Sequence, residues 1–132
     1  MAEMNALDAL LSASIEVEEE VLIKRLGVHF RVKGLTGDKI NSLREQCTYF
    51  EGKGANRKRI INEDELGQLL IATACIEPDF SNPKLLEKYG ARDAADCVQK
   101  ALLAGEVVTL SHAVLDVSEF RVTEEDVEEA KN

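Results

Sequence analysis

The sequence predicts an α+β fold that is mostly α, with an N-terminal β-hairpin followed by about five short helices around one aliphatic core. Three observations lead to this prediction. Val28, Phe30 and Val32 alternate with polar residues, which is typical of a strand. Farther along, apolar residues recur at spacings of three and four, which is typical of amphipathic helices. The chain has no Trp, four Phe and two Tyr, so that Leu, Ile, Val and Ala must fill the core.

Length and composition fit one globular domain. The chain has 132 residues, of which 45% are hydrophobic and 31% are charged, and this excludes an intrinsically disordered protein. We divide it into a flexible acidic N-terminal arm (1–20), a single α-rich domain that begins with the hairpin (21–120) and an acidic C-terminal tail or short helix (121–132). No apolar run approaches the ~20 residues of a membrane span. Three cysteines without a CxxC pair favour a reducing cytosol.

The hairpin is the first element of the predicted domain. The run Val21–Leu26 is rich in residues that favour strands, and the alternating run Val28–Val32 follows it. Gly27 lies between them and tolerates the positive φ that a tight turn needs. A lone hairpin is marginal in water, so its apolar face must lie against helices or a partner chain.

The first two predicted helices flank a basic loop. Thr36 is a candidate N-cap for a helix over Asp38–Phe50, whose apolar residues form one buried stripe. The loop Gly52–Arg59 is glycine-rich and is the one concentrated basic patch in the sequence, with Lys53, Arg57, Lys58 and Arg59. Asn62 then begins a helix that Pro78 ends. Because this helix is apolar nearly all round, we expect it to be central to the core.

Three further helices are predicted. The Asn82-Pro83 pair begins one that Gly90 ends, because Pro is tolerated at the first helical position and Gly closes helices in the left-handed conformation. Asp93 caps the next helix. After a break at Gly105, an amphipathic pattern continues to about Ser118. No second core is indicated, which supports one domain.

The sequence shows no pattern typical of catalysis or metal binding. His29 and His112 are far apart, and the chain has no HExxH, Cys/His cluster or calcium loop. It also lacks a GxSxG elbow. Three cysteines fall on predicted apolar helix faces, where a free Cys behaves as a small hydrophobe: Cys47, Cys75 and Cys97. We therefore predict no catalytic, cofactor-binding or metal-binding residue and no enzyme activity.

The basic loop could bind one of two kinds of anionic ligand, a nucleotide or a nucleic acid, and the sequence disfavours both. Gly52-Lys53-Gly54 lacks the Ser/Thr of a Walker loop and does not lie between a strand and a helix, which disfavours nucleotide. The net charge of −9 repels a nucleic acid, and no aromatic pair of the RNA-binding type interleaves with the cations. The loop is therefore expected to be solvated, or to dock on an acidic partner or on the chain's own acidic termini.

The order of packing and turn residues resembles that of the phage XkdN-like tail assembly chaperones. The resemblance covers residues 21–132. It rests on the hairpin and on Lys33–Gly37, Leu43–Thr48, Lys58-Arg59, Leu69–Ile71, Cys75–Phe80, Leu85–Gly90, Leu102–Glu106 and Val127–Asn132. Where the family pattern has Leu-Ser-Gly-Phe near its end, this chain has Val117-Ser118-Glu119-Phe120. The local turn is therefore the point of departure from the family.

The resemblance implies a non-catalytic binding role. Such chaperones coat the tape-measure protein, help tube subunits to polymerise around it and leave before the virion is complete. The implied partners are the tape-measure protein, the tail-tube protein and a second copy of the chain, without nucleic acid, membrane or cofactor, in the cytoplasm of the bacterial host. Strong net charge would keep such a complex soluble. The alternatives are a minor structural tail protein retained in the virion and, less favoured, a small nucleic-acid-binding regulator.

The candidate partner-binding residues lie near the C-terminus. An otherwise charged segment there retains four apolar side chains: Val117, Phe120, Val122 and Val127. Exposed apolar side chains on amphipathic helices are the usual contacts for a client helix. The alternative is that Phe120 and Val122 pack back onto the core of the domain.

Overall fold

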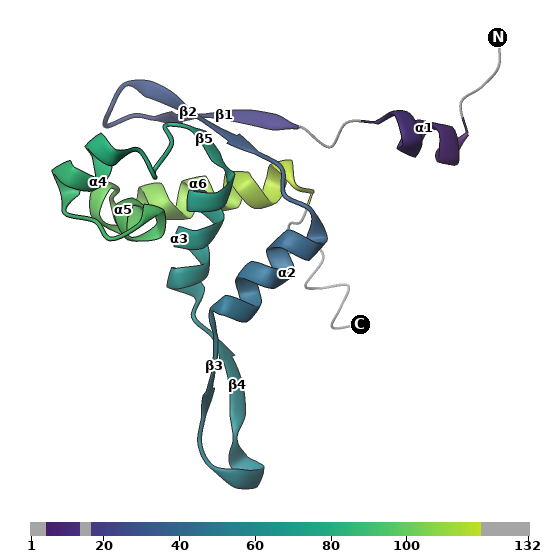
Figure 1. Ribbon diagram of the computed structural model, residues 1–132, viewed down its shortest axis with the longest axis vertical. Helices are drawn as coiled ribbons and strands as arrows, with labels where there is room; N and C mark the ends of the chain where they lie inside the picture. The colour runs from purple at the N-terminus through teal and green to yellow at the C-terminus, as the bar shows by residue number, and fades with distance from the viewer. Residues whose placement is uncertain (1–4, 14–16, 120–132) are drawn as a thin grey trace.

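The structure, a computed structural model, describes residues 5–13 and 17–119. Over these residues, the chain forms six α-helices and two small antiparallel sheets (Figure 1). The elements are α1 (Ala6–Ser12), β1 (Glu18–Ile23), β2 (Val28–Lys33), α2 (Gly37–Gln46), β3 (Thr48–Glu51), a 3-10 turn (Gly54–Asn56), β4 (Lys58–Ile61), α3 (Glu63–Ala74), β5 (Cys75–Glu77), α4 (Pro83–Tyr89), α5 (Ala94–Ala101) and α6 (Ala104–Val117). The predicted α+β class is confirmed.

The predicted N-terminal hairpin is present and belongs to a three-stranded sheet in the order β1-β2-β5. β1 and β2 are antiparallel, from Glu18 opposite Lys33 to Ile23 opposite Val28. Gly27 ends the turn between them with a φ of 68°, a conformation that glycine adopts at little cost. β1 begins at Glu18, before the predicted start of the hairpin at Val21. Three acidic residues of the predicted N-terminal arm, Glu18–Glu20, therefore belong to the strand.

Helices cover the apolar face of this sheet. Phe30 and Val32 on β2 are buried, whereas Val28 at the end of the strand is half exposed. α6 packs against β1 and β2, and α3 packs against α5, α6 and β2. Phe30 also meets Phe80 edge to face, with 6.1 Å between the ring centroids. Apart from one cysteine, the largest fully buried side chains are aliphatic, as predicted: Val32, Ile40, Ile71, Val98, Leu110 and Val114.

An ion pair ties the turn of this hairpin to the start of α6. Arg25 donates from Nε and Nη2 to the two carboxylate oxygens of Glu106, at 2.9 and 2.8 Å. Nη2 also donates to the carbonyl of Ala101 at 3.2 Å. Glu106 in turn accepts the N–H of Leu103 at 2.8 Å, which closes the first turn of α6. One carboxylate therefore holds both the hairpin and the helix N-terminus.

The helix predicted over Asp38–Phe50 is wrong at its C-terminal end. α2 ends at Gln46, and the chain then forms the hairpin β3–β4, which projects away from the rest of the molecule (Figure 1). The predicted basic loop Gly52–Arg59 is the turn and half of the second strand of this hairpin. Thr, Tyr and Phe favour strands, and β4 supplies their hydrogen-bonding partner. Phe50, predicted to be buried, is 53% exposed.

The helix predicted from Asn62 also ends early, at Ala74 and not at Pro78. The three residues after Ala74 form β5, which pairs antiparallel with β2 and sets Cys75 opposite Val32. The free edge of β2 offers backbone N–H and C=O groups, and an adjacent segment of chain satisfies them. The two strands are far apart in the sequence, and their pairing overrides the local helical pattern.

The three remaining helices are confirmed together with their caps. Asn82 Oδ1 accepts the N–H of Lys84 at 2.9 Å to begin α4, and Gly90 ends it with a φ of 61°. Asp93 caps α5 by accepting an N–H three residues later at 2.9 Å. α6 is capped at its C-terminus by Ser118, as the amphipathic pattern indicated.

One buried carboxylate was not predicted. Asp96 on α5 is only 8% exposed. It accepts the backbone N–H of Arg92 at 2.9 Å, and Lys100 Nζ lies 3.0 Å from the same oxygen. These donors favour the ionised form and hold the pKa of Asp96 below its ordinary value of 3.8. Through the hydrogen bond from Arg92, Asp96 therefore links α5 to the residues that precede this helix.

Asp96 should make the free energy of unfolding depend on pH. Because its pKa is lowered in the folded state, its contribution is complete above the unfolded pKa and is lost as the pH falls through the folded pKa. We expect Asp96→Asn to be less stable than wild type at about pH 6, and to lose less stability between about pH 6 and pH 3. Urea unfolding at both pH values measures this. Asp116→Asn, at an exposed acid of α6, is the control, and an unchanged pH dependence in Asp96→Asn would contradict the expectation.

Candidate partner-binding surfaces

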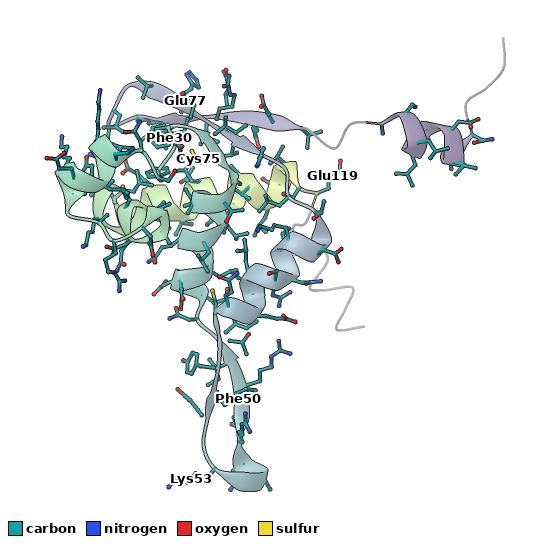
Figure 2. The ribbon with its side chains drawn as sticks, in the orientation of Figure 1. Phe30, Phe50, Lys53, Cys75, Glu77 and Glu119 are labelled. Carbon is teal, nitrogen blue, oxygen red and sulfur yellow. The ribbon has the colours of Figure 1, made fainter. Side chains whose placement is uncertain are left out.

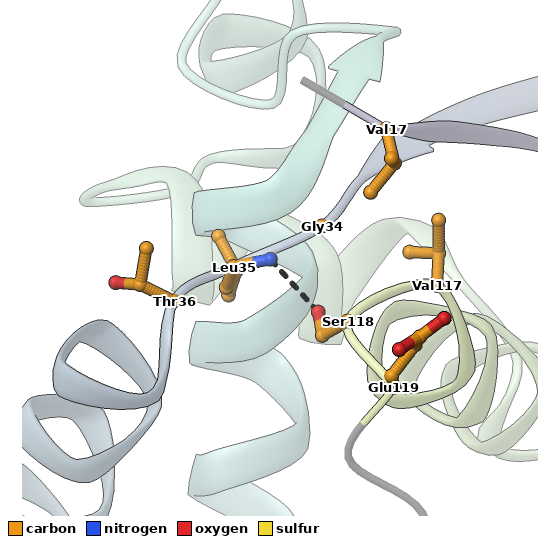
Figure 3. Close-up of a pocket in the computed structure, with 7 residues that line it drawn as sticks. All are labelled: Val17, Gly34, Leu35, Thr36, Val117, Ser118 and Glu119. Atoms are coloured by element: carbon orange, nitrogen blue, oxygen red, sulfur yellow. Dashed lines mark hydrogen bonds between the residues drawn. The ribbon is translucent and has the colours of Figure 1, made fainter. Parts of the chain in front are cut away.

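The first candidate surface is a corner pocket at the C-terminal end of α6 (Figure 3). It is a hollow of about 320 Å³. Three parts of the chain meet there: the residue before β1, the connection from β2 to α2, and the end of α6. The lining residues are Val17, Gly34, Leu35, Thr36, Val117, Ser118 and Glu119. Val17 and Glu119, the described residues at the two ends of the domain, therefore both lie at this corner.

Hydrogen bonds and one close approach hold the corner together. Ser118 Oγ accepts the N–H of Leu35 at 2.8 Å and donates to the carbonyl of Val114 at 2.6 Å. The N–H of Gly34 donates to the carbonyl of Val17 at 2.8 Å. A Cβ on Gly34 would lie 2.6 Å from Val17 Cγ2 and 3.2 Å from the carbonyl oxygen of Val117, so a larger residue would require these neighbours to shift. The chain leaving β2 is thereby fixed against both β1 and α6.

The structure places one of the four predicted partner-binding residues. Val117 lines the corner pocket beside Val17 (Figure 3) and is partly buried against the core. Phe120, Val122 and Val127 lie outside the described residues. The geometry therefore neither groups the four side chains nor separates them, and their shared role stays a prediction.

The turn after α6, where the sequence differs from the family pattern, has an unusual backbone conformation. Glu119, at the position where glycine was expected, has a φ of 57°. Its N–H donates to the carbonyl of Asp116 at 3.0 Å, which closes the end of α6. The left-handed region is favourable for glycine and costs energy for residues with a Cβ. Glu119 thus adopts the left-handed conformation that the expected glycine would adopt more easily.

The second candidate surface is the helix α1, which lies apart from the rest of the molecule (Figure 1). Asn5 begins it by accepting the N–H of Asp8 at 2.8 Å. Leu7, Leu10 and Leu11 are 64–75% exposed. Because residues three and four apart lie on one side of a helix, these leucines form a single apolar stripe. This part of the predicted N-terminal arm thus contains a helix, and the apolar side of that helix meets no other described element.

The third candidate surface is the hairpin β3–β4. The Arg57 guanidinium lies over the Phe50 ring, 3.7 Å from its centroid, and Phe50 and Lys53 mark the strand and the turn in Figure 2. The four basic residues of the predicted patch lie on a hairpin and not on a loop. The sequence did contain a signal for it, since two short runs of strand-favouring residues flank Gly52 and Gly54.

The remaining titratable groups of residues 5–13 and 17–119 form no reactive arrangement. Burial raises the pKa of the Cys75 thiol to about 12 and also raises those of Cys47 and Cys97. His29 and His112 are exposed on separate elements, β2 and α6. Within these ranges no three His, Cys, Asp or Glu side chains come together as a metal site. None of the helices there has the length and apolar character to cross a membrane.

The chain is similar to known proteins over most of its length. The model of a family described as phage XkdN-like tail assembly chaperone protein matches residues 7–131. The phage-like element PBSX protein XkdN of Bacillus subtilis (strain 168) is 27% identical over 108 residues, which cover 80% of this chain and 73% of that protein. The crystal structure of the protein YqbN has a TM-score of 0.64 at 16% identity and covers 92% of this chain and 100% of that one. At this identity, the likeness to YqbN shows the fold alone.

Glu119→Gly should stabilise the domain. Glycine removes the cost of the left-handed conformation, an advantage that its greater freedom in the unfolded chain partly offsets. We expect a gain of about 0.5–1 kcal/mol in the free energy of unfolding, measured by urea denaturation. Glu119→Ala removes the same charge but keeps a Cβ, so it should give no such gain. An equal gain in both variants would show that charge, and not backbone conformation, is responsible.

Proposed function

The chain belongs to the phage XkdN-like tail assembly chaperone family, and from this membership we propose that it binds a tape-measure protein and assists assembly of the tail tube around it without catalysing a reaction. The observation that carries the proposal is the family match, which extends over nearly the whole chain. The similarity to the PBSX protein XkdN, from a phage-like element, supports it.

We assign the client contact to two groups of apolar side chains, which belong to the chain segments adjoining the corner pocket. One group is the exposed stripe of α1, with Leu7, Leu10 and Leu11. The other is the C-terminal set, with Val117, Phe120, Val122 and Val127. Helical clients are commonly bound through apolar anchors at spacings of three and four, which the α1 stripe has. Both segments join the domain at Val17 and Val117, so a client could contact them together.

The chemistry of the described residues supports a binding role over a catalytic one. Burial keeps the three thiols protonated at neutral pH, with Cys75 the most affected. The buried carboxylate, Asp96, already has Arg92 and Lys100 as partners. A general acid or base needs a group that is free to exchange its proton with a substrate. Neither kind of side chain meets that requirement.

Capture of the tape-measure protein tests the client contact. In cells that express both proteins, tagged wild type should co-purify the tape-measure protein from the same tail gene cluster. Leu7→Asp/Leu10→Asp/Leu11→Asp and Phe120→Ala/Val122→Ala/Val127→Ala should each reduce the captured amount about tenfold or more, because apolar anchors dominate such interfaces. Val108→Ala, at an exposed valine of α6, is the matched control and should capture like wild type. No capture by wild type would overturn the client, and full capture by both triple variants would overturn the assigned surface.

The transient nature of the role has a separate test. A chaperone of the host cytoplasm should be absent from purified virions or tails, or present only in traces, when they are measured by quantitative mass spectrometry. The alternative, a minor structural tail protein, predicts a fixed number of copies per particle. A constant stoichiometry across preparations would establish the alternative and remove the transient part of the proposal.

A further inference from the structure

The hairpin β3–β4 has a charge opposite to that of the chain as a whole. Residues 48–61 contain four cations and one acid, whereas the whole chain has a net charge of −9. The hairpin also projects from the rest of the domain (Figure 1). A cationic element of this kind attracts anionic partners to one place on a protein that otherwise repels them.

The arginines divide into two groups by their partners. Among the six arginines in the described ranges, three lie within 4 Å of a carboxylate: Arg25 with Glu106, Arg31 with Glu18 and Arg92 with Asp96. The other three form no ion pair with any described residue: Arg44, Arg57 and Arg59. Within the described residues, the unpaired arginines thus lie on the hairpin β3–β4 and in the last turn of α2.

The three unpaired arginines share one side of the hairpin. Phe50 lies directly opposite Arg59 in the register, so these side chains are on one face. Strand alternation puts Arg57 on that face too, and its guanidinium indeed stacks on the Phe50 ring. Arg59 and Arg44 line the same hollow, of about 370 Å³, which Glu45 also borders without pairing to either. We call this surface, formed by Arg44, Arg57, Arg59 and Phe50, the arginine face.

The chemistry of the arginine face selects oxyanions. Planar guanidinium groups bind carboxylates and phosphates through paired N–H donors. Two observations favour carboxylates on a polypeptide over a nucleic acid. Arg57 occupies one side of the Phe50 ring, so that side is closed to a stacking base. The net charge of the chain also repels a long polyphosphate, whereas a short acidic segment can approach the hairpin alone.

We propose that the arginine face is a binding site for a Glu- or Asp-rich segment of a partner polypeptide. The site lies on an element distinct from α1 and from the corner pocket. The proposal goes beyond the proposed function, because it names a recognition chemistry and does not depend on the identity of the client. A partner with an acidic segment would contact the guanidinium groups of Arg57 and Arg59 along β4 and that of Arg44 at its base.

The test uses the full chain and a fluorescein-labelled deca-glutamate peptide, with binding followed by fluorescence anisotropy at about 50 mM salt. We expect the wild type to bind the peptide and Arg44→Gln/Arg57→Gln/Arg59→Gln to lose at least about tenfold in affinity, because charge-assisted bonds are removed. Arg57→Gln/Arg59→Gln, at two exposed positions, should show the same direction of change and covers the case in which the triple variant does not fold. Thermal unfolding checks each variant.

The matched control removes three positive charges from the rest of the domain. Lys24→Gln/Lys39→Gln/Lys84→Gln changes the net charge by the same amount at exposed lysines, and it should bind like wild type. A labelled deca-thymidine oligonucleotide is the parallel probe. No peptide binding by wild type, or an equal loss in the lysine variant, would overturn the proposal. Tighter binding of the oligonucleotide that depends on the arginines would replace the acidic polypeptide with a nucleic acid.

Discussion

The fold depends on covering the central strand β2. A two-stranded hairpin is marginal in water, and β2 carries Phe30 and Val32, which must be removed from it. β1 and β5 pair with its two edges, and α3 and α6 pack against the sheet. Arg25 ties the hairpin turn to α6 through Glu106. The position of the corner pocket follows from this arrangement, because it lies where the covering helix α6 ends.

The corner at the end of α6 connects the fold to the proposed client contact. Ser118 and Gly34 bring the end of α6, the start of β1 and the connection to α2 into one place (Figure 3). The chain segments on either side of the domain, 1–16 and 120–132, therefore start from neighbouring points although they are far apart in sequence. Under the proposed client contact, two weak apolar contacts acting together would bind more tightly than either alone.

The arginine face and the surfaces near the corner pocket are proposed to serve two kinds of recognition, of charge and of apolar side chains. The hairpin β3–β4 projects from the side of the molecule that lies away from the three-stranded sheet (Figure 1). Its guanidinium groups recognise charge, whereas the α1 stripe and the C-terminal set offer apolar contact. Electrostatic contacts set the rate and specificity of association more than its strength, and apolar anchors supply most of the affinity. The two surfaces are thus complementary in what they can contribute to one assembly step.

The sequence alone determined the features that depend on neighbouring residues. The caps at Asn82 and Asp93, the closing Gly90 and the first hairpin were all predictable, because each requires only a turn residue and a local hydrophobic period. The basic residues of the hairpin β3–β4 were also visible as a compositional pattern. The family resemblance likewise rested on local packing and turn residues, and the family match bears it out.

Tertiary structure alone decided the rest. Residues 75–77 continue a helical pattern, yet they form β5 because β2 has an edge to pair with. Phe50 fits the apolar stripe of α2, yet it lies on β3, where pairing with β4 sets Arg57 and Arg59 beside it. Arg44, from a different element, joins them only in space. The physical reason is common to these cases: hydrogen bonding and packing between distant segments outweigh local preferences of a few tenths of a kcal/mol per residue.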